Sequence, residues 1–181
     1  MKFQQTFRQI TDFLQKEELD HALIGAFAMQ AYGYVRATRD LDLVVNVVDQ
    51  ATIIAHMESL GYETLHCSPG FSNHIHADFQ AGRIDFVYVS GRTAQQLFQA
   101  ARPLPLFDET PVPVVSPEHL AALKIFAMKN NPDRALQDMA DVQFLLSLPD
   151  ADEKVIKEYF HKYGQMDRFH EIANNTHRTG R

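Results

Sequence analysis

The sequence has 181 residues, of which 45% are hydrophobic and 22% charged, and its formal net charge is −6. This is the composition of an ordinary globular protein, and the acidic balance argues against non-specific binding to nucleic-acid backbones, which relies on Lys and Arg. The single Cys67 excludes an internal disulfide and a cysteine-based zinc module, so we expect a cytoplasmic protein.

The N-terminal segment and the apolar runs do not have the pattern of targeting or membrane segments. Residues 1–15 space their apolar side chains instead of running them together, unlike a signal peptide. The longest apolar runs fall far short of the ~20 residues that a membrane span requires. We therefore expect neither export nor a membrane partner.

In chain order, the first elements alternate between helix and strand. A helical apolar stripe predicts a helix over 3–17, and residues 21–26 predict a strand that turns at Gly25 into a short helix. Residues 40–48 predict a central strand covered on both faces, and 51–61 a helix that ends at a glycine. The stripe of the first helix consists of Phe3, Phe7, Ile10 and Leu14.

A β-hairpin is predicted next, with segments 72–80 and 83–90 joined by a two-residue turn at 81–82. This register places Asp78 opposite Asp85 and puts His74 and His76 on the same face of the hairpin as these carboxylates. Opposed carboxylates are destabilising unless a cation or a proton lies between them, so the pattern suggests a metal site or a raised pKa.

The remainder of the chain predicts mostly helices. Residues 93–101 predict a helix, and the proline-rich segment 102–115 a connection with one short edge strand at its end. Helix-start signals occur at Ser116 and Asn131, and residues 151–173 predict one or two further helices. The helix after Asn131 has a predicted apolar stripe of Ala135, Leu136, Met139, Val142 and Leu146.

The fold class that follows is α/β (α+β), with a mixed β-sheet core over residues 1–115 and a helical region over 116–181. Asp40 and Asp42 are two apart on the central strand, so both point to one face, where hard cations such as Mg²⁺ find oxygen ligands. Asp85 on a neighbouring strand is the best third carboxylate. Gly25 and Ala26 lie at a strand-to-helix turn whose free backbone N–H groups can hold an anion.

Taken together, LIGAFAMQAYGYVRATRDLDLVV and the later RIDFVYV resemble the nucleotidyltransferase superfamily with the DNA-polymerase-β-like fold, and in particular its AbiEii-type members. The resemblance covers residues 21–89. It implies a small-residue turn, here Gly25 and Ala26, followed by an Asp-x-Asp strand. Many members have Ser at the second turn position, where this chain has Ala26, which leaves only backbone contacts to the terminal phosphate.

The resemblance implies the roles of individual residues. Asp40, Asp42 and Asp85 would be the catalytic, metal-binding carboxylates, with Mg²⁺ or Mn²⁺ as cofactor and an NTP as substrate. Gly25, Ala26, Arg39 and Lys124 would contact the nucleotide. The expected reaction transfers a nucleoside monophosphate to a hydroxyl of RNA, protein or a small molecule, and an antitoxin is an expected partner.

Supporting roles are expected in the helical region. Lys124 is the only polar residue of LAALKIFAM, so its buried ammonium needs either a phosphate or a protein carboxylate. Arg134, Asp138 and Asp141 share a helix face and could form a salt-bridge network near the site, as Asp78 could from the hairpin. Which aspartate points inward is left open by the spacing.

Two other functions are compatible with the sequence. The chain could be a catalytically weak nucleotide- or metal-binding interaction module of the same fold, which Ala26 favours. Alternatively, His74, His76 and Asp78 could bind Zn²⁺ in a phosphohydrolase, because His-x-His on a strand can chelate this ion.

Overall fold

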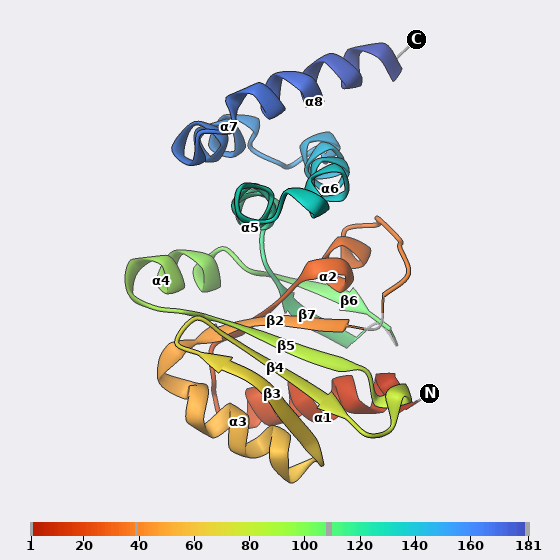
Figure 1. Cartoon of the computed structure of the whole chain (residues 1–181), viewed down its shortest axis with the longest axis vertical. Coiled ribbons are helices and arrows are strands. Elements are labelled where there is room, and N and C mark those ends of the chain that lie inside the picture. The colour runs from red at the N-terminus through yellow and green to blue at the C-terminus, as the bar shows by residue number, and fades with distance from the viewer. Residues whose placement is uncertain (1, 39, 108–109, 180–181) are drawn as a thin grey trace. The chain divides into compact units, whose positions relative to one another are not determined.

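The computed structural model describes residues 2–38, 40–107 and 110–179, and the chain divides into two compact units, Met1–Val115 and Ser116–Arg181 (Figure 1). The first unit is a mixed α/β structure on one seven-stranded sheet, in agreement with the predicted fold class. In the second unit, the described residues form helices and their connections. No helix of the described ranges combines the length and apolarity needed to cross a bilayer.

The sheet has the strand order β3-β4-β5-β2-β1-β7-β6, which puts β2 at its centre. β2 (Asp40–Asn46) runs antiparallel to β1 (His21–Ile24) and parallel to β5 (Arg83–Val89). The other strands are β3 (Tyr62–Ser68), β4 (Phe71–His76), β6 (Arg102–Leu106) and β7 (Thr110–Val114).

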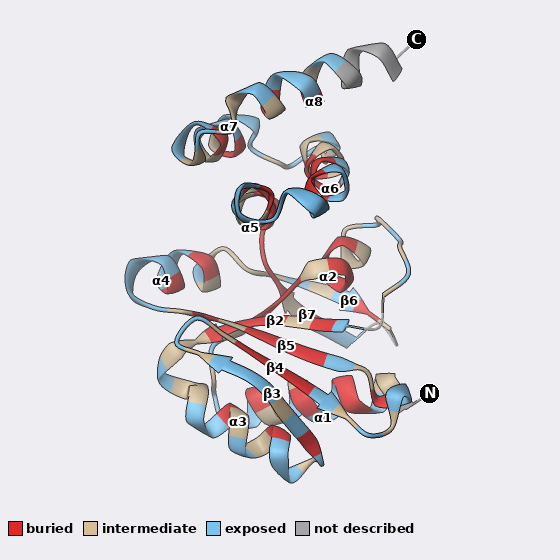
Figure 2. Cartoon of the chain, viewed as in Figure 1, coloured by how far each residue is buried: buried red, intermediate tan, exposed pale blue. Residues whose placement is uncertain are grey.

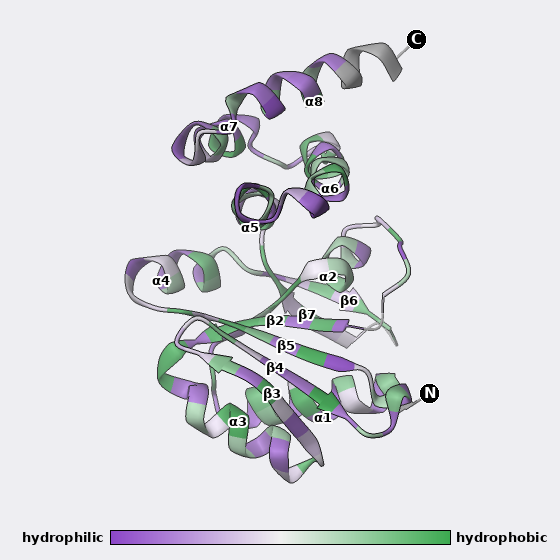
Figure 3. Cartoon of the chain, in the orientation of Figure 1, coloured by the Kyte–Doolittle hydropathy of each residue, from purple (hydrophilic) through white to green (hydrophobic). Residues whose placement is uncertain are grey.

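Side chains alternate along β2 and β5, which gives this part of the sheet a fully apolar face. Leu41, Leu43, Ile84 and Phe86 are no more than 1% exposed. Figure 2 shows buried residues along both strands, and Figure 3 shows the apolar stretches within them. Helices α1 (Lys2–Lys16) and α3 (Gln50–Ser59) lie together on one side of the sheet (Figure 1), and the stacked rings of Phe13 and His56 join them.

Helix α2 (Gly25–Ala31) follows β1 without an intervening loop and lies on the other side of the sheet from α1 and α3 (Figure 1). Its residues Ala26 to Met29 are buried. Helix α4 (Gly91–Gln99) follows β5 and buries Ala94 and Leu97. The predicted helices at 3–17, 51–61 and 93–101 therefore all form, with ends shifted by one or two residues.

The connection between β4 and β5 differs from the predicted hairpin. Asn73 lies opposite Asp85 in the register, so the predicted pairing of Asp78 with Asp85 is wrong. The strand ends at His76, and the 3₁₀ turn η2 (Phe79–Ala81) lengthens the connection. Oδ1 of Asp78 accepts the backbone N–H of Gln80 in this turn, and the chain leaves the ladder before a two-residue turn can form.

Two further strands were not predicted. β3 pairs antiparallel with β4 at one edge of the sheet, and β6 pairs antiparallel with β7 where only one short strand was expected. In the β6–β7 hairpin, Pro103 faces Pro113 and Pro105 faces Pro111. Because proline has no N–H, these facing pairs fit the positions of the ladder that form no mutual hydrogen bonds.

In the second unit, α5 (Pro117–Asn130) begins as predicted, with Ser116 as its cap and proline at its first position. The turn η3 (Pro132–Arg134) leads into α6 (Ala135–Ser147), followed by α7 (Glu153–Tyr163) and α8 (Met166–Thr179). The predicted stripe of α6 is wrong at Leu136, which is 83% exposed. Asp138 and Asp141 occupy the inward face instead, because they have a buried cationic partner.

Candidate active site

Three predicted catalytic carboxylates lie on the same face of the sheet. β2 and β5 pair in parallel, with Asp42 beside Asp85 and Asp40 beside Arg83. Because alternate residues of a strand share a face, all three aspartates project on the face opposite the apolar one. Asp85 is 8% exposed and Asp40 is exposed, so the cluster extends from the sheet interior to its surface.

The turn from β1 to α2 lies against this cluster. Gly25 adopts a φ of +65°, and a Cβ at this position would overlap Oδ2 of Asp42. Both the left-handed backbone and the close approach therefore require glycine. Ala26 follows at 3% exposure and has no hydroxyl, so residue 26 can contact a ligand here only through its backbone.

Arg83, which was not among the predicted site residues, neutralises part of the carboxylate charge. Its Nε donates to Oδ1 of Asp85 at 3.0 Å, and its Nη2 donates to Oδ2 at 2.9 Å. Asn73 Nδ2 also donates to Oδ1 of Asp85. The hydrogen bonds to Asp85 raise the pKa of Arg83, and the charges of Asp40 and Asp42 raise it further. The sequence signal for this ion pair is the two-residue spacing of Arg83 and Asp85, which puts both side chains on the same face of a strand.

The donor chemistry of this face suits a divalent cation. Asp40 and Asp42 supply hard oxygen ligands of the kind that Mg²⁺ prefers. Both oxygens of Asp85 are engaged by Arg83, and among the described residues no three His, Cys, Asp or Glu side chains are grouped closely enough to hold an ion. The oxygens of Asp40 and Asp42 suit a metal, whereas Arg83 already occupies an acceptor position on each oxygen of Asp85.

Lys124, predicted to face nucleotide phosphates, pairs with two carboxylates of α6 instead. Its Nζ lies 3.0 Å from Oδ1 of Asp138 and 2.6 Å from Oδ2 of Asp141. The three side chains are 8%, 0% and 1% exposed. Both aspartates thus point inward toward α5, whereas Arg134, the expected centre of their network, is exposed. Arg39, also predicted to contact the nucleotide, lies outside the described residues.

His74 lies on the opposite face of the sheet from Asp85, because it pairs with Ile84. It is fully buried, and its ring nitrogens lie within hydrogen-bond distance of two hydroxyls, Ser72 Oγ at 2.8 Å and Thr64 Oγ1 at 3.1 Å. Burial lowers the pKa of His74. The predicted common face of His74 and Asp85 is therefore wrong.

His76 and Asp78 serve the turn after β4. Nδ1 of His76 accepts the backbone N–H of Asp78 at 2.9 Å, and Oδ1 of Asp78 accepts the backbone N–H of Gln80 at 3.0 Å. The zinc ligand set His74, His76 and Asp78 does not assemble among the described residues. The expected supporting role of Asp78 near Asp85 is likewise replaced by this local role.

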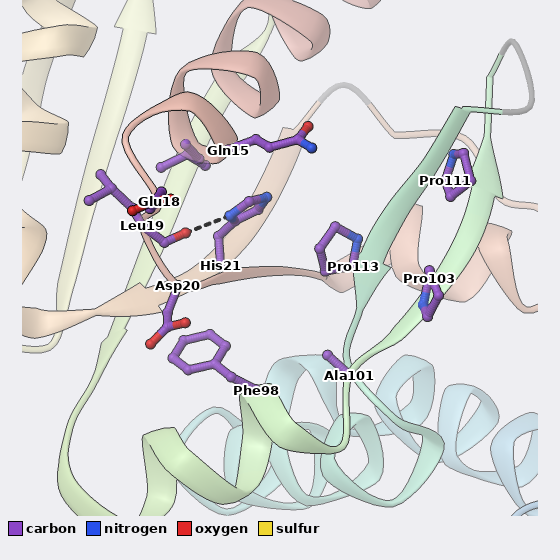
Figure 4. A pocket seen from close by; sticks show the side chains of 11 residues that line it. Gln15, Glu18, Leu19, Asp20, His21, Phe98, Ala101, Pro103, Pro111 and Pro113 are labelled. Carbon is purple, nitrogen blue, oxygen red and sulfur yellow. Dashed lines mark hydrogen bonds between the residues drawn. The ribbon is translucent and has the colours of Figure 1, made fainter.

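Two pockets of the first unit differ in their relation to the carboxylates. The larger, of about 520 Å³, lies beside the end of α1 and the β6–β7 hairpin (Figure 4) and is lined by none of the predicted site residues. In it, Nδ1 of His21 lies 2.7 Å from the carbonyl oxygen of Leu19. The other, of about 340 Å³, is lined by Thr38 and Gly82, which lie just before β2 and β5.

Comparison with protein families identifies the family of the chain. The model of the family described as "Nucleotidyl transferase AbiEii toxin, Type IV TA system" matches residues 82–180, more than half of the chain. The chain belongs to the AbiEii family of nucleotidyltransferases. The match includes Asp85 and Lys124, whereas Asp40 and Asp42 precede it. No curated protein matches the chain significantly.

Solved structures share the fold of this AbiEii-family transferase. The solution structure of the antibiotic-resistance factor ANT(2'')-Ia has a TM-score of 0.69 at 12% identity, covering 98% of this chain and 100% of that one. The lincosamide antibiotic adenylyltransferase LnuA, with lincomycin bound, has a TM-score of 0.57 at 16% identity, covering 79% and 96%. An antigenic nucleotidyltransferase-like protein from Paracoccidioides brasiliensis has a TM-score of 0.58 at 15% identity, covering 91% of this chain and 88% of that one.

Proposed function

We propose that this AbiEii-family chain transfers a nucleoside monophosphate from an NTP to a hydroxyl group and releases pyrophosphate, with Mg²⁺ or Mn²⁺ as cofactor. The observation that carries the proposal is the parallel register of β2 and β5, which sets Asp42 beside Asp85 and next to the turn at Gly25. Carboxylates of separate strands therefore share one face with backbone groups suited to phosphate.

In this proposal, Asp40 and Asp42 hold the divalent cation, which when bound neutralises phosphate charge and orients the reacting oxygens. The backbone at Gly25 and Ala26 contacts the phosphates. Asp85 accepts the proton of the acceptor hydroxyl at Oδ2 after Arg83 has released that oxygen. Asn73 stays hydrogen-bonded to Oδ1 and keeps the carboxylate oriented.

The acceptor and the biological partner are also part of the proposal. The solved neighbours include ANT(2'')-Ia with adenylyl-2''-tobramycin and LnuA with lincomycin, which are small molecules with hydroxyl groups. The family description names a toxin of a type IV toxin–antitoxin system. We infer a hydroxyl acceptor in RNA, protein or a small molecule, and an antitoxin as protein partner.

Transfer of label from α-³²P-labelled NTPs to total tRNA and to cell lysate tests the reaction, base and acceptor in one assay. Asp42→Asn should reduce transfer at least about hundredfold, because it removes a carboxylate from the metal site. The matched control Asp12→Asn alters an exposed carboxylate of α1 and should leave transfer unchanged. Equal transfer by wild type and Asp42→Asn contradicts the proposal.

A second function is favoured by the ion pair between Arg83 and Asp85 and by Ala26. With Asp85 held by Arg83, the chain would bind a nucleotide or a metal without turnover and act through an interaction partner. Calorimetric NTP binding by the wild type, without pyrophosphate release in the presence of tRNA or lysate, would establish this function instead.

A further inference from the structure

The smaller pocket of the first unit, about 340 Å³ in volume, is lined by four phenylalanines. The rings of Phe3 and Phe27 stack at 5.1 Å between centroids, and the ring of Phe107 meets Phe27 edge-on at 5.5 Å. Phe107 has a φ of +53°, which is rare for a bulky residue, so the surrounding packing fixes its backbone. Phe79 lies at the rim and is 70% exposed.

The same three chain segments that build the carboxylate site also line this pocket. Thr38 lies two residues before Asp40, Gly82 directly precedes Arg83, and Phe27 lies in α2. A ligand in the pocket therefore lies close to the start of both strands that carry the aspartates. Oγ1 of Thr38 accepts the backbone N–H of Asp40 at 3.1 Å, which ties the pocket wall to the first aspartate of β2.

The lining of the pocket selects a flat, uncharged group. None of its lining residues is charged, so it offers no charged partner to a phosphate or an ammonium. Aromatic side chains stack on the faces of nucleobases, and the amides of Gln4 and Gln80 can both donate and accept hydrogen bonds at a base edge. The volume is near the lower end of small-molecule sites, which suits a single base.

We propose that this aromatic pocket binds the nucleobase of the NTP. The inference rests on the proposed function, since the triphosphate is expected at the cation on Asp40 and Asp42. Phe79 contributes a ring face at the pocket rim, and Gln4 and Gln80 contact the edge of the base. The sequence segments around Phe3, Phe27, Phe79 and Phe107 thus become parts of one specificity site.

The test uses fluorescence of 2-aminopurine riboside and of its 5′-triphosphate, which is quenched when the base stacks. The chain contains no Trp, so its own emission is low. In the full-length chain with Mg²⁺, Phe79→Ala should weaken binding of the triphosphate about fivefold or more and reduce the quenching. Val48→Ala, at another exposed apolar side chain of the same unit, should have no effect.

Inorganic triphosphate and the free riboside separate failure of this inference from failure of the proposed function. Phe79→Ala should leave competition by inorganic triphosphate unchanged, because that ligand has no base. If the wild type binds no triphosphate, the proposed function fails, yet quenching of the riboside that depends on Phe79 still supports the pocket. Unchanged nucleotide binding by Phe79→Ala overturns the inference, as does an effect only on the KM of the acceptor.

Discussion

The two units each contain a cluster of carboxylates around one cation, but they differ in their access to water. Arg83 in the first unit is 50% exposed in its side chain, whereas Lys124 in the second is 8% exposed. The carboxylates of Asp138 and Asp141 are almost completely buried, and Oδ2 of Asp138 has no hydrogen-bond partner among the described residues. Similar residues thus form two clusters. The open cluster consists of Asp40, Asp42, Asp85 and Arg83, and the closed cluster consists of Lys124, Asp138 and Asp141.

The difference in exposure indicates which cluster can exchange its cationic side chain for a metal ion. Arg83 is half-exposed, so water and salt screen its pairing with Asp85, and it can leave at a smaller cost than a buried cation. A buried cation that leaves two carboxylates behind costs several kcal/mol. The open cluster therefore suits a site that gains and loses a metal ion, and the closed cluster suits a fixed structural link between α5 and α6.

The largest effect is expected from Lys124→Met. Removal of the ammonium leaves Asp138 and Asp141 buried without their cation, which should lower the free energy of unfolding by about 3–5 kcal/mol in urea titrations. Lys129→Met changes an exposed lysine of the same helix and should cost less than about 1 kcal/mol. Equal costs for both variants would show that the closed cluster is not a structural link.

An intermediate effect on stability is expected from a change of pH. The stabilities of variants in the two clusters must therefore be compared at one pH. Burial lowers the pKa of His74 in the folded state. Below pH ~6.5 the unfolded state therefore takes up a proton before the folded state does, and the free energy of unfolding falls as the pH is lowered. One such group contributes a slope of at most about 1.4 kcal/mol per pH unit. Urea unfolding between pH 7 and 5 should show a shallower slope for His74→Gln, and an unchanged slope would contradict this origin.

The smallest effect on stability is expected from Arg83→Gln, but this variant should change metal binding. Two unit charges about 4 Å apart near a surface interact by about 4 kcal/mol, and exposure reduces the net value to about 1 kcal/mol. Mn²⁺ should therefore bind about fivefold more tightly to Arg83→Gln than to the wild type, measured by calorimetry without nucleotide. Arg92→Gln, at an exposed arginine of α4, serves as control. Weaker or equal Mn²⁺ binding by Arg83→Gln would mean that Arg83 does not compete for this site.

The local patterns of the sequence predict the centre of the site well. Strand alternation is enough to place Asp40 and Asp42 on one face, and Gly25 marks the turn beside them. The neighbouring position of Asp85 also follows, since its strand is apolar on both sides of it. The shared face of Asp40 and Asp42 depends on residues two positions apart, where geometry is fixed by the backbone. Their approach to Gly25 and Asp85 depends on the pairing of β2 with β1 and β5.

The features that were missed depend on turns and contacts that an alternating or helical pattern does not show. The register of β4 placed Asn73 instead of Asp78 beside Asp85, because a 3₁₀ turn lengthens the connection. An apolar stripe alone could not show that Leu136 is exposed while Asp138 is buried. That exchange depends on Lys124, which reaches α6 from the preceding helix.

The proline pairs of the β6–β7 hairpin also determine how the sheet can meet other chains. β6 is an edge strand, and its positions that form no hydrogen bonds to β7 direct their backbone groups outward. Pro103 and Pro105 occupy these positions, so an incoming strand would find no N–H donors there. Strand addition by a second copy or a misfolded chain is therefore blocked at β6, which leaves β3 as the sheet edge where such growth could begin.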